Sequence, residues 1–108
     1  MKNTLVRIIE GADSPTVSNV FANNDCALCV LQITGTYSTA TLAVQGLIDT
    51  EAGEWTDIAV FDLSNLRLTD KGAKGNGIYT AAVEGILRIR LNLESIADGS
   101  LTAVANFR

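Results

Sequence analysis

The feature that most constrains this chain is a strict alternation of apolar and polar residues in its C-terminal half. Over Ile86 to Leu93 the sequence reads I-L-R-I-R-L-N-L, in which positions 87, 89, 91 and 93 are apolar and the positions between them polar. A period of two places one set of side chains on each face of an extended strand. Ala40 to Ile48 and Ser100 to Arg108 carry the same period. These segments predict strands that bury one face and expose the other.

Further strands are predicted between clusters of turn-forming residues. Cys26 to Thr34 is nearly all apolar, which is typical of a central strand that is covered on both faces. No segment of a dozen residues holds the 3.6-residue apolar period of a helix, although Leu93 to Ala97 could form one short turn. The pattern predicts an all-β fold, a single antiparallel β-sandwich of about eight strands. The remaining expected strands are Leu5 to Ile9, Thr16 to Phe21, Trp55 to Phe61, Leu63 to Leu68 and Gly77 to Val83.

Composition supports one folded domain over residues 1–108 and narrows the function classes. Apolar residues make up 47% and charged residues 19% of the 108 positions, which is too hydrophobic for a disordered chain. Eight Lys and Arg against twelve Asp and Glu give a net charge of −4 without a basic run, so nucleic acid is not an expected partner. Histidine is absent, which removes the usual general base and the commonest metal ligand. No apolar run approaches a membrane span of about 18 residues, and the N-terminus lacks a signal-peptide pattern, so neither a membrane nor a leader is expected.

Two motifs and one cluster resemble known sites without completing them. Cys26 and Cys29 have the spacing of redox and zinc pairs, but no other Cys and no His could complete a zinc site. Positions three apart in a strand face opposite sides, so two free, buried thiols are expected. Asp70 to Gly77 has three glycines and two lysines but lacks the order of a phosphate-binding loop, which favours a mobile loop. An acidic cluster lacks calcium-loop spacing and predicts a solvated turn: Asp49, Glu51, Glu54 and Asp57. No catalytic, cofactor or metal site is predicted.

Aromatic and cationic residues are the candidates for binding. Trp55, Tyr79 and Tyr37 could stack on sugar rings if exposed, or pack in the core or in an interface. Arg88 and Arg90 project from the same face of one predicted strand. They would either be solvated or form ion pairs at a subunit contact.

The last predicted strand suggests an interface of a different kind. Within Ser100 to Arg108, Val104 has the opposite parity to the other large apolar side chains. One face of this strand could therefore contact the core and the other a neighbouring molecule. An open sandwich also exposes strand edges, and closed symmetric assembly is a common way to cover them. Self-association is therefore expected.

An ordered set of short motifs resembles the small β-sandwich modules of tailed-phage virion proteins. Those modules occur in head fibres, capsid decorations and parts of tails or baseplates. The similarity runs from about Val30 to the C-terminus, whereas Met1 to Asn24 is unmatched and the loop Asp70 to Gly77 departs from the pattern. The motifs are Leu42-Ala-Val-Gln-Gly46, Gly53-Glu-Trp-Thr-Asp-Ile58, Gly77-Ile-Tyr79, Val83-Glu-Gly85, Arg88-Ile-Arg-Leu91 and Gly99-Ser-Leu-Thr-Ala103.

The resemblance implies a jelly-roll-like fold and a non-enzymatic structural role. The protein would lie at the outer surface of a phage head or tail, be assembled in the host bacterial cytoplasm, and act by protein–protein assembly. Its partners would be copies of itself, with a trimer as the first choice, and other virion proteins. The alternative is a carbohydrate-binding module that uses exposed aromatic rings on a host-surface glycan. A small bacterial enzyme or inhibitor is a weaker alternative, because no nucleophile and base are evident in the sequence.

Overall fold

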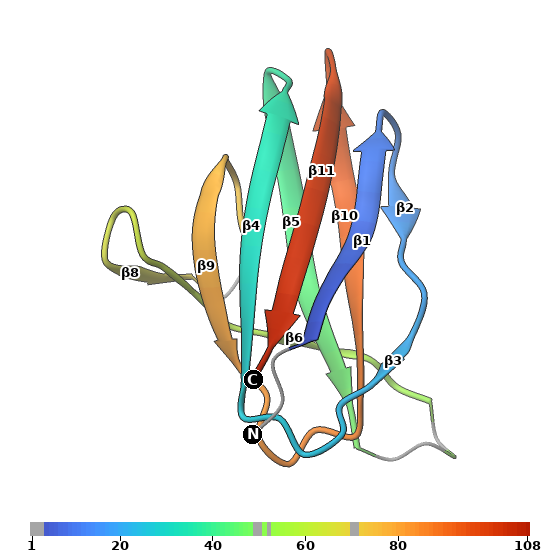
Figure 1. The fold of residues 1–108 in the computed structure, drawn as a ribbon. Coiled ribbons are helices and arrows are strands. Elements are labelled where there is room, and N and C mark those ends of the chain that lie inside the picture. The colour runs from blue at the N-terminus through green and yellow to red at the C-terminus, as the bar shows by residue number, and fades with distance from the viewer. Residues whose placement is uncertain (1–3, 49–50, 52, 70–71) are drawn as a thin grey trace.

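The structure is a computed structural model that describes residues 4–48, 51, 53–69 and 72–108. All regular structure in these ranges is extended, in two sheets that pack face to face (Figure 1). No helix in the described ranges is long and apolar enough to cross a membrane. The predicted all-β sandwich is confirmed. In chain order the strands are β1 (Thr4–Ala12), β2 (Thr16–Val17), β3 (Phe21–Ala22), β4 (Leu28–Thr36), β5 (Thr39–Leu47), β6 (Thr56–Ile58), β7 (Val60–Asp62), β8 (Arg67–Thr69), β9 (Gly77–Ala82), β10 (Arg88–Ala97) and β11 (Ser100–Phe107).

Strand pairing shows how the chain winds. The six-stranded sheet has the order β1-β11-β4-β9-β7-β8, and the other sheet has the order β2-β10-β5-β6, with β3 also paired to β10. The first strand thus pairs with the last, β2 and β3 with β10, β4 with β9, and β5 with β6, all antiparallel. This is one long ribbon folded over itself, the arrangement of a jelly roll. The eight strands of a jelly roll are present, with β2 and β3 as two pieces of one strand, and the β7–β8 hairpin is an addition to them.

Three predicted segments differ from the structure. Trp55 to Phe61 is divided between β6 in one sheet and β7 in the other, because the chain crosses between sheets there. Leu63 to Leu68 is mostly the turn between β7 and β8. Leu93 to Ala97 is not a helical turn but the end of β10, where a register shift between Leu93 and Ser95 interrupts the period of two.

Strand β4 is central, as predicted, but it is buried on one face only. It lies between β11 and β9, and its inward residues Cys29, Leu31 and Ile33 are buried whereas Leu28 and Gln32 are exposed. The apolar run therefore does not reflect a strand that is covered on both faces. The outward side of β4 belongs to an open face of the molecule.

The core lies between the two sheets. Its side chains are the inward residues that the alternating segments predict, and burying each large one contributes about 1.5–3 kcal/mol. The two sheets are joined at one end by Asp98 and Gly99, between β10 and β11. A Cβ atom at Gly99 would collide with the carbonyl oxygen of Thr36, so this turn requires glycine. The largest fully buried side chains are Leu31, Ile33, Leu42, Val44, Val60, Val83, Ile89, Leu91, Leu93 and Leu101.

A buried asparagine ties together the opposite end of the sandwich. The Asn23 side-chain nitrogen donates to the carbonyls of Cys26, Val83 and Ile86 at 3.0, 2.8 and 2.9 Å. The two residues after Asn23 have φ angles of 53° and 63°, and the Cys26 amide donates to the Asn23 carbonyl, as in a type I′ turn. Asn23 therefore joins the chain entering β4 to the β9–β10 connection. The sequence predicts only a turn here.

Candidate functional site

The sequence-predicted binding residues lie in three separate places. Trp55, Arg88 and Arg90 lie outward on the sheet that contains β10, β5 and β6. Val104 points outward from β11 on the other sheet, where it is partly exposed. Tyr79 points inward from β9 and belongs to the core. The structure therefore offers two distinct surfaces rather than one site.

We call the first surface the charged face and define it by Trp55, Arg88, Arg90, Gln45 and Asp57. The Arg90 guanidinium carbon lies 4.4 Å from the centre of the Trp55 ring, which is cation–π geometry. The Arg90 Nε–H donates to Gln45 Oε1 at 2.8 Å, and Gln45 Nε2 donates to Asp57 Oδ1 at 2.9 Å. Because these residues belong to β10, β5 and β6, side-chain contacts link all three strands.

Strand register explains why these side chains meet. Arg90 pairs with Gln45, and Gln45 pairs with Asp57, so the three residues lie directly opposite one another. Side chains in such positions point to the same face of the sheet and are close enough to interact. Gln45 is only 8% exposed because its neighbours cover it. Arg88 is the first residue of β10, where it is exposed and its Nη1 donates to the Leu87 carbonyl at 3.2 Å.

We call the second surface the uncharged face and define it by the outward side chains of β11, β4 and β9. None of these three neighbouring strands contains an Asp, Glu, Lys or Arg. The strands are paired in register, so Val104 lies opposite Gln32 and Gln32 opposite Ile78. The face consists of Thr102, Val104, Asn106, Leu28, Val30, Gln32, Thr34, Ile78, Thr80 and Ala82.

A hairpin extends this surface at the edge of the sheet. The β7–β8 hairpin projects from the body beside β9 (Figure 1). Asp62 accepts hydrogen bonds from the Asn65 side chain at 2.8 Å and the Ser64 amide at 2.9 Å; the Asn65 bond is the main reason that the pKa of Asp62 is lowered. At the tip, Leu66 is 73% exposed and has a φ of 54°, a left-handed conformation that costs a branched residue about 1–2 kcal/mol. Leu68 in β8 is 69% exposed.

The platform of three aromatic rings that the carbohydrate-binding alternative requires is not formed. Tyr79 is 4% exposed, and its hydroxyl donates to the Gly75 carbonyl at 2.8 Å. The Tyr37 hydroxyl donates to Asn76 Oδ1 at 2.7 Å. Burial is the main cause of the raised pKa of both tyrosines. A buried Tyr79 cannot stack on a sugar, so this part of the carbohydrate hypothesis is wrong.

The glycine-rich loop is attached to the body in its described part. Residues 70 and 71 lie outside the described ranges. Ala73 is buried and exchanges two backbone hydrogen bonds with Leu42, at 2.9 and 2.7 Å. Asn76 Nδ2 donates to the Gly35 carbonyl at 2.9 Å. Gly72 to Gly77 is therefore bound to β5 and to the end of β4 by hydrogen bonds, which its composition does not predict.

The two cysteines are free and buried, as predicted. Cys29 lies in β4, whereas Cys26 precedes the strand, so the argument from strand parity does not apply to the pair. Burial, with a smaller contribution from the nearby Cys26, raises the pKa of Cys29 to about 12. Among the described residues, no group of three or more His, Cys, Asp or Glu side chains is placed to hold a metal ion. Asp49, one member of the acidic cluster, lies outside the described residues.

Comparison with known proteins identifies the family of this chain. A family model described as XepA matches residues 2–105. The chain belongs to the XepA family. Two solved structures are similar, each over 98% of this chain and at 16% identity: the SPBc2 prophage-derived protein YomS, with a TM-score of 0.86, and the PBSX exported protein XepA, with a TM-score of 0.89. No curated protein matches in sequence.

The two similar structures differ in how much of their length they share with this XepA-family chain. The match covers 92% of YomS but 37% of the PBSX XepA chain. At 16% identity these likenesses show a common fold. The family match also includes most of Met1 to Asn24, the part that the virion-module resemblance leaves unmatched.

Two residues of the charged face are not predicted from the sequence of this XepA-family chain. Gln45 is an unremarkable polar position, and Asp57 is grouped with the acidic cluster because it lies near other acidic residues in the chain. Their roles depend on strand register, which places Gln45 between Arg90 and Asp57. The parity of Gln45, opposite to that of Leu42 and Val44, indicates its outward direction but not its partners.

Proposed function

We propose that this XepA-family protein is a non-enzymatic structural component of a phage or phage-derived particle, and that it acts by binding copies of itself and other proteins of that particle. The similarity to YomS, a prophage-derived protein, and to the PBSX exported protein XepA supports the phage association. The resemblance to virion modules supports a place at the outer surface of a head or tail.

The observation that carries this proposal is the uncharged face. Protein surfaces usually carry charges, and 19% of this chain is charged, yet none of the residues in β11, β4 and β9 is. Depletion of charge distinguishes the centre of a protein interface from the rest of a surface. Val104 lies within this face beside the uncharged Gln32 of β4, and its register partner on the other side is Arg7 of β1, the strand that borders the face. The face is therefore suited to burial against another protein.

The exposed leucines of the hairpin support the same conclusion. Leu66 combines high exposure with a strained backbone, so neither burial nor local backbone preference explains a leucine at this position. Strained, exposed positions are often retained because they serve a function. A leucine displayed at the tip of a projecting hairpin is suited to insertion into an apolar surface of a partner.

The proposal is tested by measuring mass in solution and occurrence in particles. We expect light scattering to show an oligomer that dissociates on dilution, with three copies as the first expectation, and immunodetection to find the protein in purified particles. A protein that is monomeric at every concentration and missing from every particle fraction would contradict the proposal. That outcome would favour glycan binding, which would have to use Trp55 without Tyr79.

A further inference from the structure

We propose that Arg90 and Arg88 on the charged face form a binding site for an extended acidic segment of a partner protein. Arg90 binds one carboxylate through its two terminal amino groups, and Arg88 binds a second carboxylate two residues along the segment. The inference rests on the proposed function in one respect, which is that the protein acts by binding other proteins. The charged face would supply one contact for such a partner.

The first step of the argument is that Arg90 is already held in one orientation. Its Nε–H is hydrogen-bonded to Gln45 at 2.8 Å, and its guanidinium carbon lies 4.4 Å from the Trp55 ring centre. Gln45 is in turn held by Asp57 at 2.9 Å. A free arginine side chain samples many rotamers, and ordering it opposes binding. Here contacts within the protein do this ordering before a ligand arrives.

The second step is that the free donors of Arg90 suit a carboxylate. A guanidinium has five N–H groups in a planar fork, and the two terminal amino groups can bind both oxygens of one carboxylate. The hydrogen bond to Gln45 uses the Arg90 Nε–H, and the Trp55 ring contacts the flat face of the guanidinium. Within the described part of the chain, the two terminal amino groups donate to no carboxylate. Asp57, the acidic residue of the charged face, is hydrogen-bonded to Gln45 instead.

The third step concerns spacing and charge. Arg88 and Arg90 point to the same side of β10, and alternate residues of a strand are about 6.6–6.8 Å apart. An extended acidic segment repeats its side chains at the same distance, so carboxylates at alternate positions match both arginines. The site also places two positive charges on one face of a protein whose net charge is −4. Nucleic acid is disfavoured, because it requires a longer array of cations.

Trp55 favours a peptide over a sugar as the ligand. The Arg90 guanidinium covers part of the ring, so that surface is not open for stacking a sugar ring. The same ring shields one side of the guanidinium from water and thereby strengthens its interaction with an anion. The contact therefore favours charge recognition over ring stacking.

The experiment uses the full chain and two synthetic peptides of the same length. One peptide alternates aspartate with threonine and valine in an extended pattern, and the other has asparagine at each aspartate position. Trp55 is the only tryptophan, so its fluorescence reports directly on the site. We expect the acidic peptide to change this fluorescence with an affinity that falls as salt is added, and the amide peptide to have no effect. Equal effects of both peptides would overturn the proposal.

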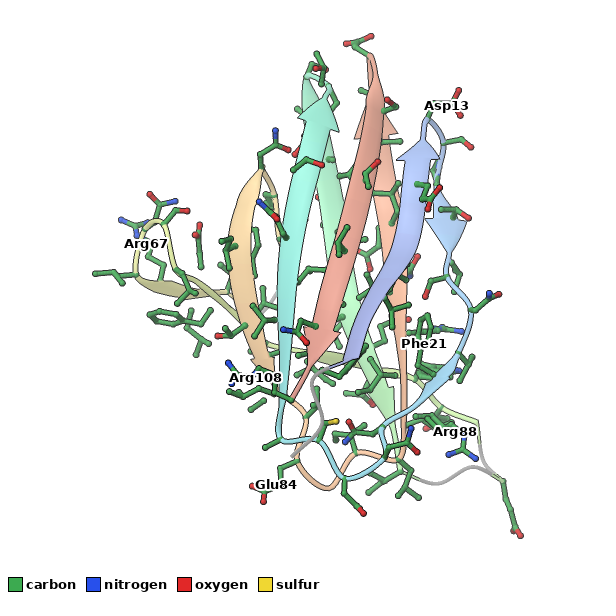
Figure 2. The ribbon with its side chains drawn as sticks, viewed as in Figure 1. Asp13, Phe21, Arg67, Glu84, Arg88 and Arg108 are labelled. Atoms are coloured by element: carbon green, nitrogen blue, oxygen red, sulfur yellow. The ribbon has the colours of Figure 1, made fainter. Side chains whose placement is uncertain are left out.

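Arginine-to-lysine variants locate the binding. R90K keeps the charge but loses the planar fork, and we expect it to weaken binding of the acidic peptide about tenfold or more. The matched control is R67K on the hairpin, which lies on the other side of the molecule from Arg88 (Figure 2). R67K should bind as the wild type does, and thermal unfolding should show that both variants are folded. Equal losses in R90K and R67K would overturn the proposal.

A third arm distinguishes the source of the carboxylate. Polyglucuronate offers carboxylates on a sugar chain, and fluorescence titration with this polymer shows whether a glycan is preferred. Binding of polyglucuronate with no binding of the acidic peptide would contradict the inference. The measurement does not require self-association or the presence of particles, so its failure leaves the proposed structural role intact.

Discussion

The outward sides of the two sheets are built over the same core by the same alternation of residues, but they differ in chemistry. On the charged face, Arg90, Gln45, Asp57 and Trp55 contact one another and hold a guanidinium in one orientation. On the uncharged face, β11, β4 and β9 contain no charged residue. The first arrangement suits selective recognition of an ionic group, and the second suits burial of area. The two faces therefore suit two different modes of binding, ionic recognition on one sheet and burial of uncharged surface on the other.

The largest expected effect is that of a charge placed in the uncharged face. Val104→Lys should leave the fold intact, because the side chain is partly exposed, but should weaken self-association by about 3 kcal/mol or more, since the added ammonium group, in register with Arg7 of β1, would lose water without gaining a partner. Light scattering over a dilution series measures this effect. Val20→Lys introduces the same change at an exposed valine outside the uncharged face and should have little effect. An oligomer that survives in V104K would show that this face is not the contact.

The next effect tests whether the interior beneath the uncharged face excludes water. Cys29 lies on the inner side of β4, and burial raises its pKa from 9.0 to about 12. Above pH 9 the unfolded chain loses the thiol proton and the folded protein keeps it, so the free energy of unfolding should fall by about 1.4 kcal/mol per pH unit until about pH 12. Denaturant unfolding at several alkaline pH values measures this slope. Cys29→Ala should have a shallower slope, and identical slopes would mean that water reaches the thiol.

A smaller effect tests the hairpin next to the uncharged face. Leu66→Gly removes a strained left-handed leucine, so the free energy of unfolding should rise by up to about 1 kcal/mol, while self-association weakens. Leu68→Gly, in β8, is the matched control and should destabilise the fold by about 0.5–1 kcal/mol, because glycine is unfavourable within a strand. Unfolding curves and light scattering on both variants give the two quantities. A stabilised L66G that associates as well as the wild type would exclude the hairpin from the contact.

The smallest effect is expected on the charged face. Trp55→Leu removes the ring beneath the Arg90 guanidinium and should lower the free energy of unfolding by about 0.5–1 kcal/mol, the usual value of an exposed cation–π contact. It should leave the oligomer unchanged, in contrast to Val104→Lys. Denaturant unfolding and light scattering measure the two properties. If Trp55→Leu dissociated the oligomer, the two faces would not have separate roles.

Most of the fold could be predicted from local patterns, whereas the sites could be predicted only in part. Ile86 to Leu93 and Ser100 to Arg108 are strands because alternation of apolar residues fits the two-residue repeat of an extended backbone. The direction of Arg90 and Val104 follows from the same parity. The link from Arg90 through Gln45 to Asp57 could not be predicted, because it depends on the pairing of strands distant in the chain.

By itself, the sequence determined that the chain forms strands, which side chains of the regular strands face inward, and that β4, β9 and β11 each lack a charged residue. These properties depend on neighbouring residues and on backbone geometry. Tertiary structure alone decided that Trp55 to Phe61 divides between two sheets, that Tyr79 is buried, and that the glycine-rich segment is fixed to β5 through Ala73. The physical reason is that burial and hydrogen-bond partners come from residues far along the chain, so they exist only when the two sheets have packed together.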